Sequence, residues 1–467
     1  MDAPSYQQLL LDNRQLREQL AQRDRLIEQL QQTIRALQQR VELSERSAKR
    51  QAAPFSKGPP KKNPKKPGRK AGDEHGPHGH RQPPPPDQIA ETLDAPLPAH
   101  CPDCGGAVVE DHLDRQFQTE IPRQPILREF KIHCGHCHQC GKHLRGRHPL
   151  QTSAATGVAQ SQLGPDAQAA VVYLNKHAGT SYGKIADIFA KHYGITVTRG
   201  ACAPIVLRAG KILQPVYEQI QERIQDSEHL TPDETGWRIG GQPAWLHAWV
   251  GDDGATLYAI DPQRSADVLE KVIGIDWSGA MTHDGFSSYE RFEDVVHQQC
   301  VDHALRRARG LVDKHTGVAK VFPRQVIELF TDALQLRDRL NEANADPVDH
   351  DRRERAYDDY TQRLRDLTEG RRRNVANNRF AKHLYNHIAC WFIFLVNPDI
   401  PATNHRAEQA LKTPIVNRKV WGGNRTDAGG AAQAVTSSVL QTCKNRAVDA
   451  FTYLSNAFRG ILGNLFT

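Results

Sequence analysis

Acidic residues at the ends of strand-like stretches carry the strongest chemical pattern in this sequence. Asp233 and Glu234 stand side by side in "HLTPDETGWRI" (229–239), and Asp284 follows the strand-like start of "GAMTHDGFSSY". Carboxylates are the ligands that hard cations such as Mg²⁺ prefer. In-line attack on a phosphodiester uses two such ions about 3.5–4 Å apart, one activating the nucleophile and one steadying the leaving oxygen. Two aspartates are too few for such a cage, so a third carboxylate is required.

Glu408 is the candidate for that third carboxylate. It lies in the first turns of an expected helix in "PATNHRAEQALKTPIVNRKVWGG". The sequence predicts that Thr403 or Asn404 caps this helix and that Pro414 bounds it.

Each acid also has a plain structural alternative. Asp233 and Glu234 could form an exposed strand edge, Asp284 with the following glycine could be a simple turn, and Glu408 could lie on a solvated helix face. For Glu234 we expect either that exposed edge or a supporting position beside the site. Because strand side chains alternate, Glu234 should point to the face opposite Asp233.

The elements that must position these acids follow a recognisable order. Three strands (229–239, 244–251 and 255–261) are separated by turns, and a helix, a fourth strand, a fifth strand and a basic helix follow. This is the order of a ribonuclease-H-like domain, in which the ends of the first and fourth strands meet at one edge. The charged helical stretch 310–386 separates Asp284 from Glu408 and must leave the sheet as an insertion.

Cysteines form a second chemical pattern, between residues 98 and 148. "CPDCGG" and, after a strand-like stretch, "HCGHCHQCGKHLRGR" each place cysteines three apart, a spacing at which a tight turn presents two thiolates to one zinc ion. In the second segment Cys134 with Cys137 is an alternative pair, and the nearby histidines are possible substitutes. The expected ligands of a structural zinc are Cys101, Cys104, Cys137 and Cys140.

Basic and helical segments indicate contact with nucleic acid. Residues 164–214 predict three helices (166–177, 181–192 and 199–213), an arrangement that resembles a helix-turn-helix. The Pro- and Gly-rich stretch 49–96 cannot bury a core, and its first half is a basic arm able to neutralise phosphates. The candidate DNA-contacting residues are Lys61, Lys62, Lys65, Lys66, Arg69, Arg199, Arg306, Arg307, Arg418 and Lys419.

The N-terminal 48 residues predict a coiled coil. Leu9, Leu16, Leu30 and Leu37 lie seven or fourteen apart, and a second apolar seam is offset by four. This heptad pattern favours a parallel dimer, so we expect a homodimer or higher oligomer.

Length, charge and composition set the remaining bounds. A chain of 467 residues predicts several domains, and a net charge of +7 suits a polyanionic partner. The sequence lacks a membrane-length apolar run and a signal-peptide pattern, and its clustered cysteines favour metal binding in a reducing, cytoplasmic compartment.

The motif blocks together resemble the insertion-sequence-66 family of DDE transposases. The resemblance rests on "PDETGWRI", "THDGFSSYE", "HQQCVDHALRRA" and "PATNHRAEQALK…NRKVWGG", and on the order of coiled coil, basic linker and cysteine pairs. It implies a catalytic triad of Asp233, Asp284 and Glu408. The chain departs from the family pattern at Asn404-His405, where many members have paired asparagines, and at "WGGNRTD".

The implied protein is a bacterial, nucleoid-associated transposase that binds terminal inverted repeats and catalyses metal-dependent strand cleavage and transfer. Two Mg²⁺ ions, replaceable by Mn²⁺, would serve the triad, Zn²⁺ would be structural, and accessory proteins of the same element are possible partners. The alternatives are an inactive zinc-ribbon DNA-binding regulator and a nuclease without strand transfer.

The expected fold is multidomain α+β. Its expected divisions are a coiled coil (1–48), a basic linker (49–96), a zinc ribbon (97–150), a helix-turn-helix-like domain (151–226), a ribonuclease-H-like catalytic domain (227–426) with a helical insertion (310–386), and C-terminal helices (427–467).

Overall fold

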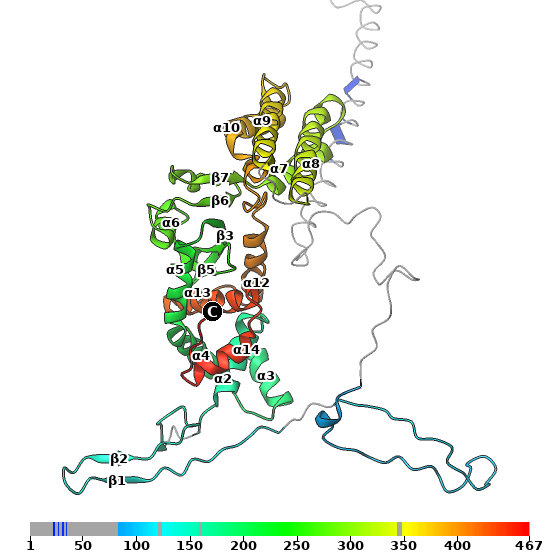
Figure 1. The fold of residues 1–467 in the computed structure, drawn as a ribbon, viewed down its shortest axis with the longest axis vertical. Helices are drawn as coiled ribbons and strands as arrows, with labels where there is room; N and C mark the ends of the chain where they lie inside the picture. The colour runs from blue at the N-terminus through cyan, green and yellow to red at the C-terminus, as the bar shows by residue number, and fades with distance from the viewer. Residues whose placement is uncertain are drawn as a thin grey trace, which may run out of the picture. The chain divides into compact units, whose positions relative to one another are not determined.

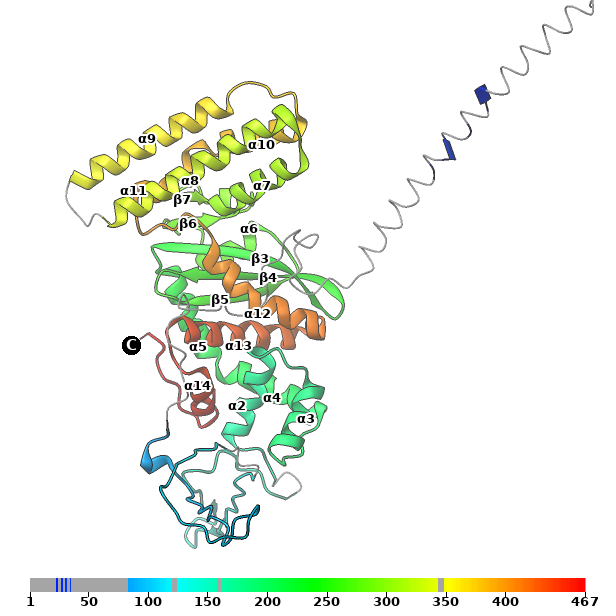
Figure 2. The ribbon, with the colours of Figure 1, turned by 90° about the vertical axis from the view of Figure 1, so that its right-hand side faces the viewer.

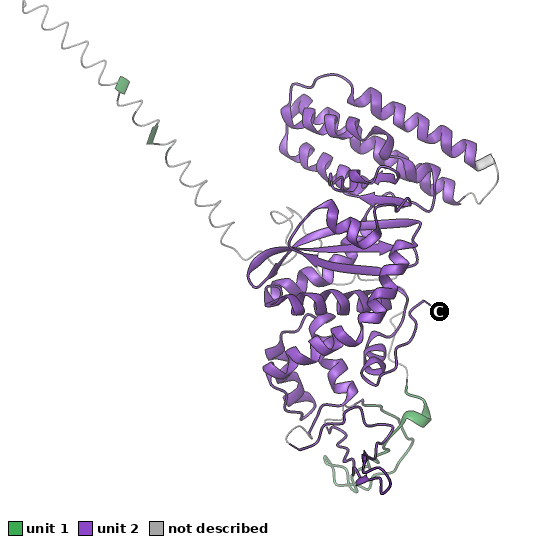
Figure 3. Ribbon diagram, turned by 90° about the vertical axis from the view of Figure 1, so that its left-hand side faces the viewer, with its two compact units in different colours: residues 1–118 green, residues 119–467 purple. Residues whose placement is uncertain are grey.

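The computed structural model describes residues 22–23, 27, 30–31, 34, 83–119, 124–157, 161–342 and 348–466. The coiled coil expected over 1–48 therefore lies almost wholly outside the described residues. The same holds for the basic residues expected to contact DNA in the linker, which are Lys61, Lys62, Lys65, Lys66 and Arg69. The chain divides into two units, residues 1–118 and 119–467 (Figure 3).

A mixed five-stranded sheet forms the centre of the second unit (Figure 1). The strand order is β5-β4-β3-β6-β7; β3, β4 and β5 are antiparallel to one another, and β6 runs parallel to both β3 and β7. This order and these directions are consistent with a ribonuclease-H-like core. The strands are β3 (His229–Ile239), β4 (Gln242–Gly251), β5 (Thr256–Asp261), β6 (Ala280–His283) and β7 (Val296–Gln299).

Helix α12 (His405–Trp421) covers one face of this sheet and crosses β3 and β4 (Figure 2). Strand alternation supplies the apolar contacts, since Leu246 and Ala248 of β4 pack with Ala407 and Leu411 of the helix. The opposite face packs on α5 (Gln214–Gln225) and α6 (Ala266–Ile273).

A second helical group lies beyond the β5 edge of the sheet. It comprises α2 (Pro165–Lys176), α3 (Tyr182–His192), α4 (Arg199–Ile212), α13 (Asp427–Asn445) and α14 (Ala450–Phe458). The three helices predicted between 164 and 214 are confirmed as α2, α3 and α4. Helices α3 and α4 begin at serine or threonine caps, Ser181 and Thr198, whose hydroxyls accept from backbone amides.

Helix α13 is buried between α4 and strand β5 because its residues are small. A Cβ on Gly210 of α4 would lie 2.8 Å from the Cα of Ala432, so the two helices approach to backbone distance. On its other side, Ser438 and Thr442 accept hydrogen bonds from the β5 amides of Tyr258 (2.8 Å) and Thr256 (3.1 Å). The hydroxyls thus satisfy the free edge of the sheet.

A helical insertion leaves the sheet after β7, and its helices run from 301 to 396, beyond the predicted bounds of 310–386 at both ends. It comprises α7 (Val301–Lys314), η5 (Gly317–Lys320), α8 (Val321–Glu342), α9 (Val348–Thr368), α10 (Val375–Asn386), η6 (Ile388–Cys390) and α11 (Ile393–Val396). These helices share a core of their own, built around Phe330, Trp391 and Phe392.

Each cysteine pair expected to bind zinc lies in a tight turn. In the first unit, Cys101 N–H donates to Gly106 O (2.8 Å) and Gly105 N–H donates to Cys101 O (2.9 Å). In the second unit, Cys137 and Gly141 form the same two bonds, to Lys142 O and Cys137 O. The second turn is flanked by strands β1 (Cys134–His136) and β2 (His143–Arg145), and the first by a single bridge between His100 and Ala107.

Two local predictions are wrong. Pro414 does not bound the helix that carries Glu408, because α12 continues to Trp421 and ends at Gly422 in a left-handed conformation. The strand-like stretch between the cysteine pairs forms no strand over its described residues, 117–119 and 124–133. An extended segment becomes a strand only with a partner, and Pro125 lacks the amide that a ladder needs.

Within the described ranges, no helix is long and apolar enough to cross a membrane.

Candidate active site

Asp233 and Asp284 occupy equivalent positions on neighbouring parallel strands. The pairing of β3 with β6 joins His229 to Ala280 and Leu230 to Met281, and each aspartate lies three residues beyond the last of these partners. Asp233 pairs across β4 with Ala248, whose neighbours include the first turns of α12. The fold therefore directs both acids toward the α12 side of the sheet.

Helix α12 places Glu408 close enough for its charge to act on Asp233. Glu408 lies in its first turn and is half-buried. Burial raises the pKa of Asp233 to about 7, and the charges of Glu234, Asp284 and Glu408 all act in the same direction. Only the Glu234 amide, which donates to Asp233 Oδ1 (2.9 Å), opposes them. Asp233 is thus electrostatically coupled to both of the other predicted acids.

The turn after Asp284 fixes its carboxylate. The Phe286 amide donates to Asp284 Oδ1 (3.0 Å), and Gly285 adopts a φ of +86°. A Cβ at that glycine would also lie 2.7 Å from Gln299 Oε1, so the turn requires glycine. Burial raises the pKa of Asp284, the charge of Glu234 adds to the effect, and Phe286, His303 and Arg264 lower it.

Glu408 is paired with two side chains of α7. Arg306 Nη2 donates to its Oε1 (3.2 Å), and His303 Nε2 lies 3.7 Å from the same atom. Arg306 also pairs with Asp302 (2.5 Å). The other ring nitrogen of His303 is buried without a partner among the described residues.

The donor set fits hard divalent cations. Burial raises the pKa of Asp233, and the charges of Glu234, Asp284 and Glu408 add to the rise, which a cation held by these carboxylates would relieve. The buried side chain of Asn404, which precedes Glu408, has both polar atoms unpaired among the described residues. Over the described ranges, however, no three His, Cys, Asp or Glu side chains are grouped as a ready-made metal site. In this structure Glu408 is engaged by Arg306 instead.

Glu234 lies behind Asp233 on the other face of the sheet, and its side chain is 2% exposed. The expectation of an exposed strand edge is therefore wrong for this residue, whereas the expectation of a supporting position on the opposite face is met. Arg264 donates to its Oε1 through Nε (2.8 Å), and the Tyr289 hydroxyl donates to its Oε2 (2.6 Å). The buried charge is thereby paired on both oxygens.

This network connects the two aspartates from behind. Arg264 lies over the ring of Phe286 (3.9 Å to the centroid) and over that of Trp245 (4.8 Å). Phe286 is the residue whose amide holds Asp284, and Glu234 is the residue whose amide holds Asp233. We name Glu234, Arg264, Phe286 and Tyr289 the supporting network.

Residues 160–432, more than half of the chain, match the protein family described as the IS66 family of transposases. The chain belongs to that family. The matched segment contains Asp233, Asp284 and Glu408, the sheet and the helical insertion. Membership in a transposase family implies DNA as the bound partner and transfer of polynucleotide strands as the reaction class.

Three similar proteins from Sinorhizobium fredii strain NGR234 bear names without an assigned function. Uncharacterized protein y4qI is 23% identical over 416 residues, covering 80% of this chain and 72% of that protein. Uncharacterized protein y4hP is 21% identical over 415 residues (82% and 74%). Uncharacterized protein y4jD is 24% identical over 310 residues (60% and 59%).

The other predicted DNA-contacting residues of this IS66-family chain are dispersed. Arg199 is exposed at the start of α4, and Lys419 is exposed near the end of α12. Arg307 lies over the ring of Phe380 (4.8 Å), and Arg418 donates to Thr235 Oγ1 (3.4 Å) of β3. Arg306 is the one of these residues that contacts a predicted catalytic acid.

The two cysteine turns differ from Cys134 in their electrostatics. Backbone amides of Cys104 and Asp103 lower the pKa of Cys101, and those of Cys140 and Gln139 lower the pKa of Cys137 in the same way. The Cys134 thiol instead donates to Ile132 O (3.7 Å) from within β1. These local features favour Cys137 with Cys140 as the second pair.

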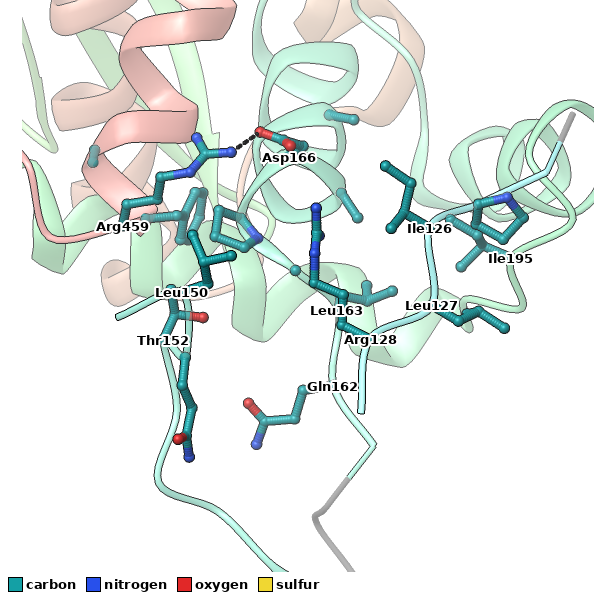
Figure 4. A pocket seen from close by; sticks show the side chains of 18 of the residues that line it. Ile126, Leu127, Arg128, Leu150, Thr152, Gln162, Leu163, Asp166, Ile195 and Arg459 are labelled. Atoms are coloured by element: carbon teal, nitrogen blue, oxygen red, sulfur yellow. Dashed lines mark hydrogen bonds and ion pairs between the residues drawn. The ribbon is translucent and has the colours of Figure 1, made fainter. Parts of the chain in front are cut away.

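A cavity of about 1490 Å³ lies in the helical region rather than at the acids (Figure 4). Its lining is largely apolar and includes Ile126, Leu150 and Ile195. Its one acid, Asp166, is paired with Arg459 (2.7 Å). The cavity therefore lacks the unpaired acids that the reaction class requires.

Sequence reasoning missed part of the site. His303, which was not among the candidate site residues, lies beside Glu408; its position in the "HQQCVDHALRRA" block was an available signal. Tyr289 likewise stands in the "DGFSSY" block. Arg264 carries no such signal, because only the folded chain brings it to Glu234.

Proposed function

We propose that this chain is an active DNA transposase in which Asp233, Asp284 and Glu408 are the catalytic acids. The observation that carries the proposal is the placement of Asp233 on β3 and Asp284 just after β6, each three residues beyond a paired residue of the parallel strands, with the charge of Glu408 from the first turn of α12 acting on Asp233. Asp233 has no basic partner among the described residues, and burial together with the neighbouring acids raises its pKa, a combination that is common at functional sites.

The three acids would hold Mg²⁺, with Mn²⁺ as a substitute. The chemistry that such ions supply is activation of the attacking oxygen and stabilisation of the leaving oxygen. The chain's own part is to hold the carboxylates in place. The supporting network fixes the first two from behind the sheet, and the stiff first turn of α12 carries the third.

Arg306 has a separate part in this proposal. While it pairs with Glu408 it neutralises that acid, and its length allows it to turn to a DNA phosphate instead. Exchange of Arg306 from Glu408 to phosphate would free the acid only when DNA is present.

The cysteine turns would bind one structural zinc through Cys101, Cys104, Cys137 and Cys140, and the basic arm and helices α3 and α4 would hold the element ends. The coiled coil expected over 1–48 would pair protomers, and proteins of the same element could assist.

The test uses the full chain and a duplex that carries the inverted repeats flanking its gene. With Mg²⁺, the protein should nick the repeat end and join its 3′-hydroxyl to target DNA. Asp233→Asn should bind the duplex with unchanged affinity and yield neither product. Binding without any nicking by the unaltered protein would indicate an inactive regulator, and nicking without joined products would indicate a nuclease; either result overturns the proposal.

A further inference from the structure

Exposed cations gather at one end of the helical insertion, where α7 ends, α8 begins and α9 turns into α10. Asn377 Nδ2 of α10 donates to Ala319 O of η5 (2.7 Å), and the rings of Phe322 and Phe380 meet edge to face, so these segments are in contact. The turn between α9 and α10 is visible at that end of the insertion in Figure 2. We name these exposed residues the cationic end: Lys314, Arg324, Arg371, Arg373 and Arg379.

The three arginines at 371–373 differ in their surroundings. The middle guanidinium is structural: Arg372 lies over the ring of Phe322 (4.1 Å) and donates to the carbonyl oxygens of Thr368 (3.0 Å) and Gly370 (3.1 Å) at the end of α9. Burial lowers its pKa. Arg371 and Arg373, on either side of it, are exposed.

The cations of this end lack the partners that cations elsewhere on the insertion have. Arg363 pairs with Asp332 (3.3 Å) and Arg337 with Asp338 (2.7 Å). Across the described part of the chain, no member of the cationic end forms an ion pair. The exposed acids of the same segments, Asp313 and Glu369, form no ion pair with these cations among the described residues, so a polyanion could still pair with them.

Helix α7 connects this end to the acids. His303 and Arg306, in its first turns, lie against Glu408, and Lys314 is its last residue. A helix rises about 1.5 Å per residue, so Lys314 lies about 12 Å along α7 from Arg306. A duplex with a phosphate at Glu408 would reach that far within a few base pairs.

We propose that the cationic end is a sequence-independent contact surface for the phosphate backbone of double-stranded DNA, engaged while the acids act on the same duplex. This rests on the proposed function and adds a second, non-catalytic contact to it. Base readout is not expected, because phosphate contacts position a duplex without reading its sequence.

The test measures binding of the full chain to a fluorescent 40-base-pair duplex over a salt series. We expect Arg371→Gln/Arg373→Gln to weaken binding to repeat and unrelated sequences alike. The slope of log affinity against log salt should fall by about 1.8, since each phosphate contact contributes about 0.9. The control Arg337→Gln/Arg363→Gln removes the same charge from the same insertion and should leave the slope unchanged.

Thermal melting separates this effect from misfolding. The Arg371→Gln/Arg373→Gln protein should have the melting temperature of the unaltered chain, whereas Arg372→Gln should have a lower one. An unchanged salt slope in the Arg371→Gln/Arg373→Gln protein overturns the inference while leaving the proposed function intact. Failure of the unaltered chain to bind any duplex would instead count against the proposed function. Reduced binding to polyglutamate with unchanged DNA affinity would also overturn the inference, by assigning the surface to an acidic protein.

Discussion

Asp233 of β3 and Asp284, the residue that follows β6, each lie three residues beyond Leu230 and Met281, which are partners on the two parallel strands. Beyond that pairing, β3 continues along β4 while β6 ends at His283. The two strands therefore separate at the point where the acids begin. Asp284 therefore follows the end of its strand, whereas Asp233 remains paired with Ala248 of β4.

Replacing Asp233 should stabilise the metal-free protein. The pKa of Asp233 in the folded chain, about 7, lies above its ordinary value of 3.8. Between these pH values the unfolded chain has lost a proton that the folded chain retains, so stability falls as pH rises through this window. Asp233→Asn should therefore have a higher melting temperature than the unaltered chain at pH 8. Its free energy of unfolding should be larger by a few kcal/mol, at about 1.4 kcal/mol per pKa unit. At pH 4 the two proteins should differ little.

Magnesium should make the unaltered chain more stable than Asp233→Asn at pH 8. Addition of Mg²⁺ at pH 8 should raise the melting temperature of the unaltered chain and not that of Asp233→Asn. An equal rise in both proteins would show that the cation binds elsewhere.

Removal of Arg306 should ease cation binding at the acids. Its guanidinium occupies Glu408 Oε1, so it competes with a cation for that oxygen. Arg306→Gln should lower the Mg²⁺ concentration that gives half of the thermal stabilisation in the absence of DNA. The control is Arg309→Gln, at an exposed arginine of the same helix, which should leave this Mg²⁺ midpoint unchanged. An equal shift of the midpoint in both variants would show that the loss of any positive charge nearby has the same effect.

Loss of the Tyr289 hydroxyl should slow strand cleavage without weakening DNA binding. This hydroxyl donates to the buried Glu234 carboxylate, and hydrogen bonds to charged groups contribute about 1.5–3 kcal/mol. Tyr289→Phe should lower the rate of cleavage by about tenfold, equivalent to about 1.4 kcal/mol. It should also raise the Mg²⁺ concentration required, while KM for DNA stays the same.

The control for this prediction is Tyr385→Phe on the exposed surface of α10. It should leave both the rate and the Mg²⁺ requirement unchanged. If Tyr289→Phe lowered only the melting temperature, the role of the supporting network would be structural alone.

Zinc content should distinguish the cysteine pairs. The full chain should contain one zinc, and Cys104→Ser should lose it. Cys134→Ser should retain it, because Cys134 lies in β1 outside the turn formed by Cys137 and Gly141. Metal analysis by mass spectrometry gives the stoichiometry, and loss of zinc from Cys134→Ser alone would assign the overlapping pair instead.

Local patterns predict the strands and helices around the acids well. The predicted strand 229–239 is β3, and the predicted helices over 166–213 are α2 to α4 within a residue or two. Period-two alternation and helix caps act over a few residues, so one sequence is enough to read them. Family membership confirms the resemblance, and the triad within it stays a prediction.

Features that depend on distant contacts could not be predicted in this way. Pro414 reads as a helix end, yet α12 continues because its apolar residues remain packed on the sheet and in the helical region. Glu234 reads as a surface acid, yet Arg264 and Tyr289 pair with it from 30 and 55 positions away. Sequence patterns that relate residues a few positions apart cannot predict contacts between residues so far apart in the chain.

Helix α12 carries a predicted catalytic acid near its start and contacts helix α2 near its end. Glu408 stands in its first turn, and nine residues later the Asn417 side chain donates to the main-chain oxygen of Lys176, the last residue of α2 (2.6 Å). Lys176 itself is buried and lies over the ring of Trp421. At about 1.5 Å per residue, α12 spans about 25 Å, so one continuous helix joins the predicted catalytic acid Glu408 to the helical group that contains α3 and α4, the helices that we propose hold the element ends.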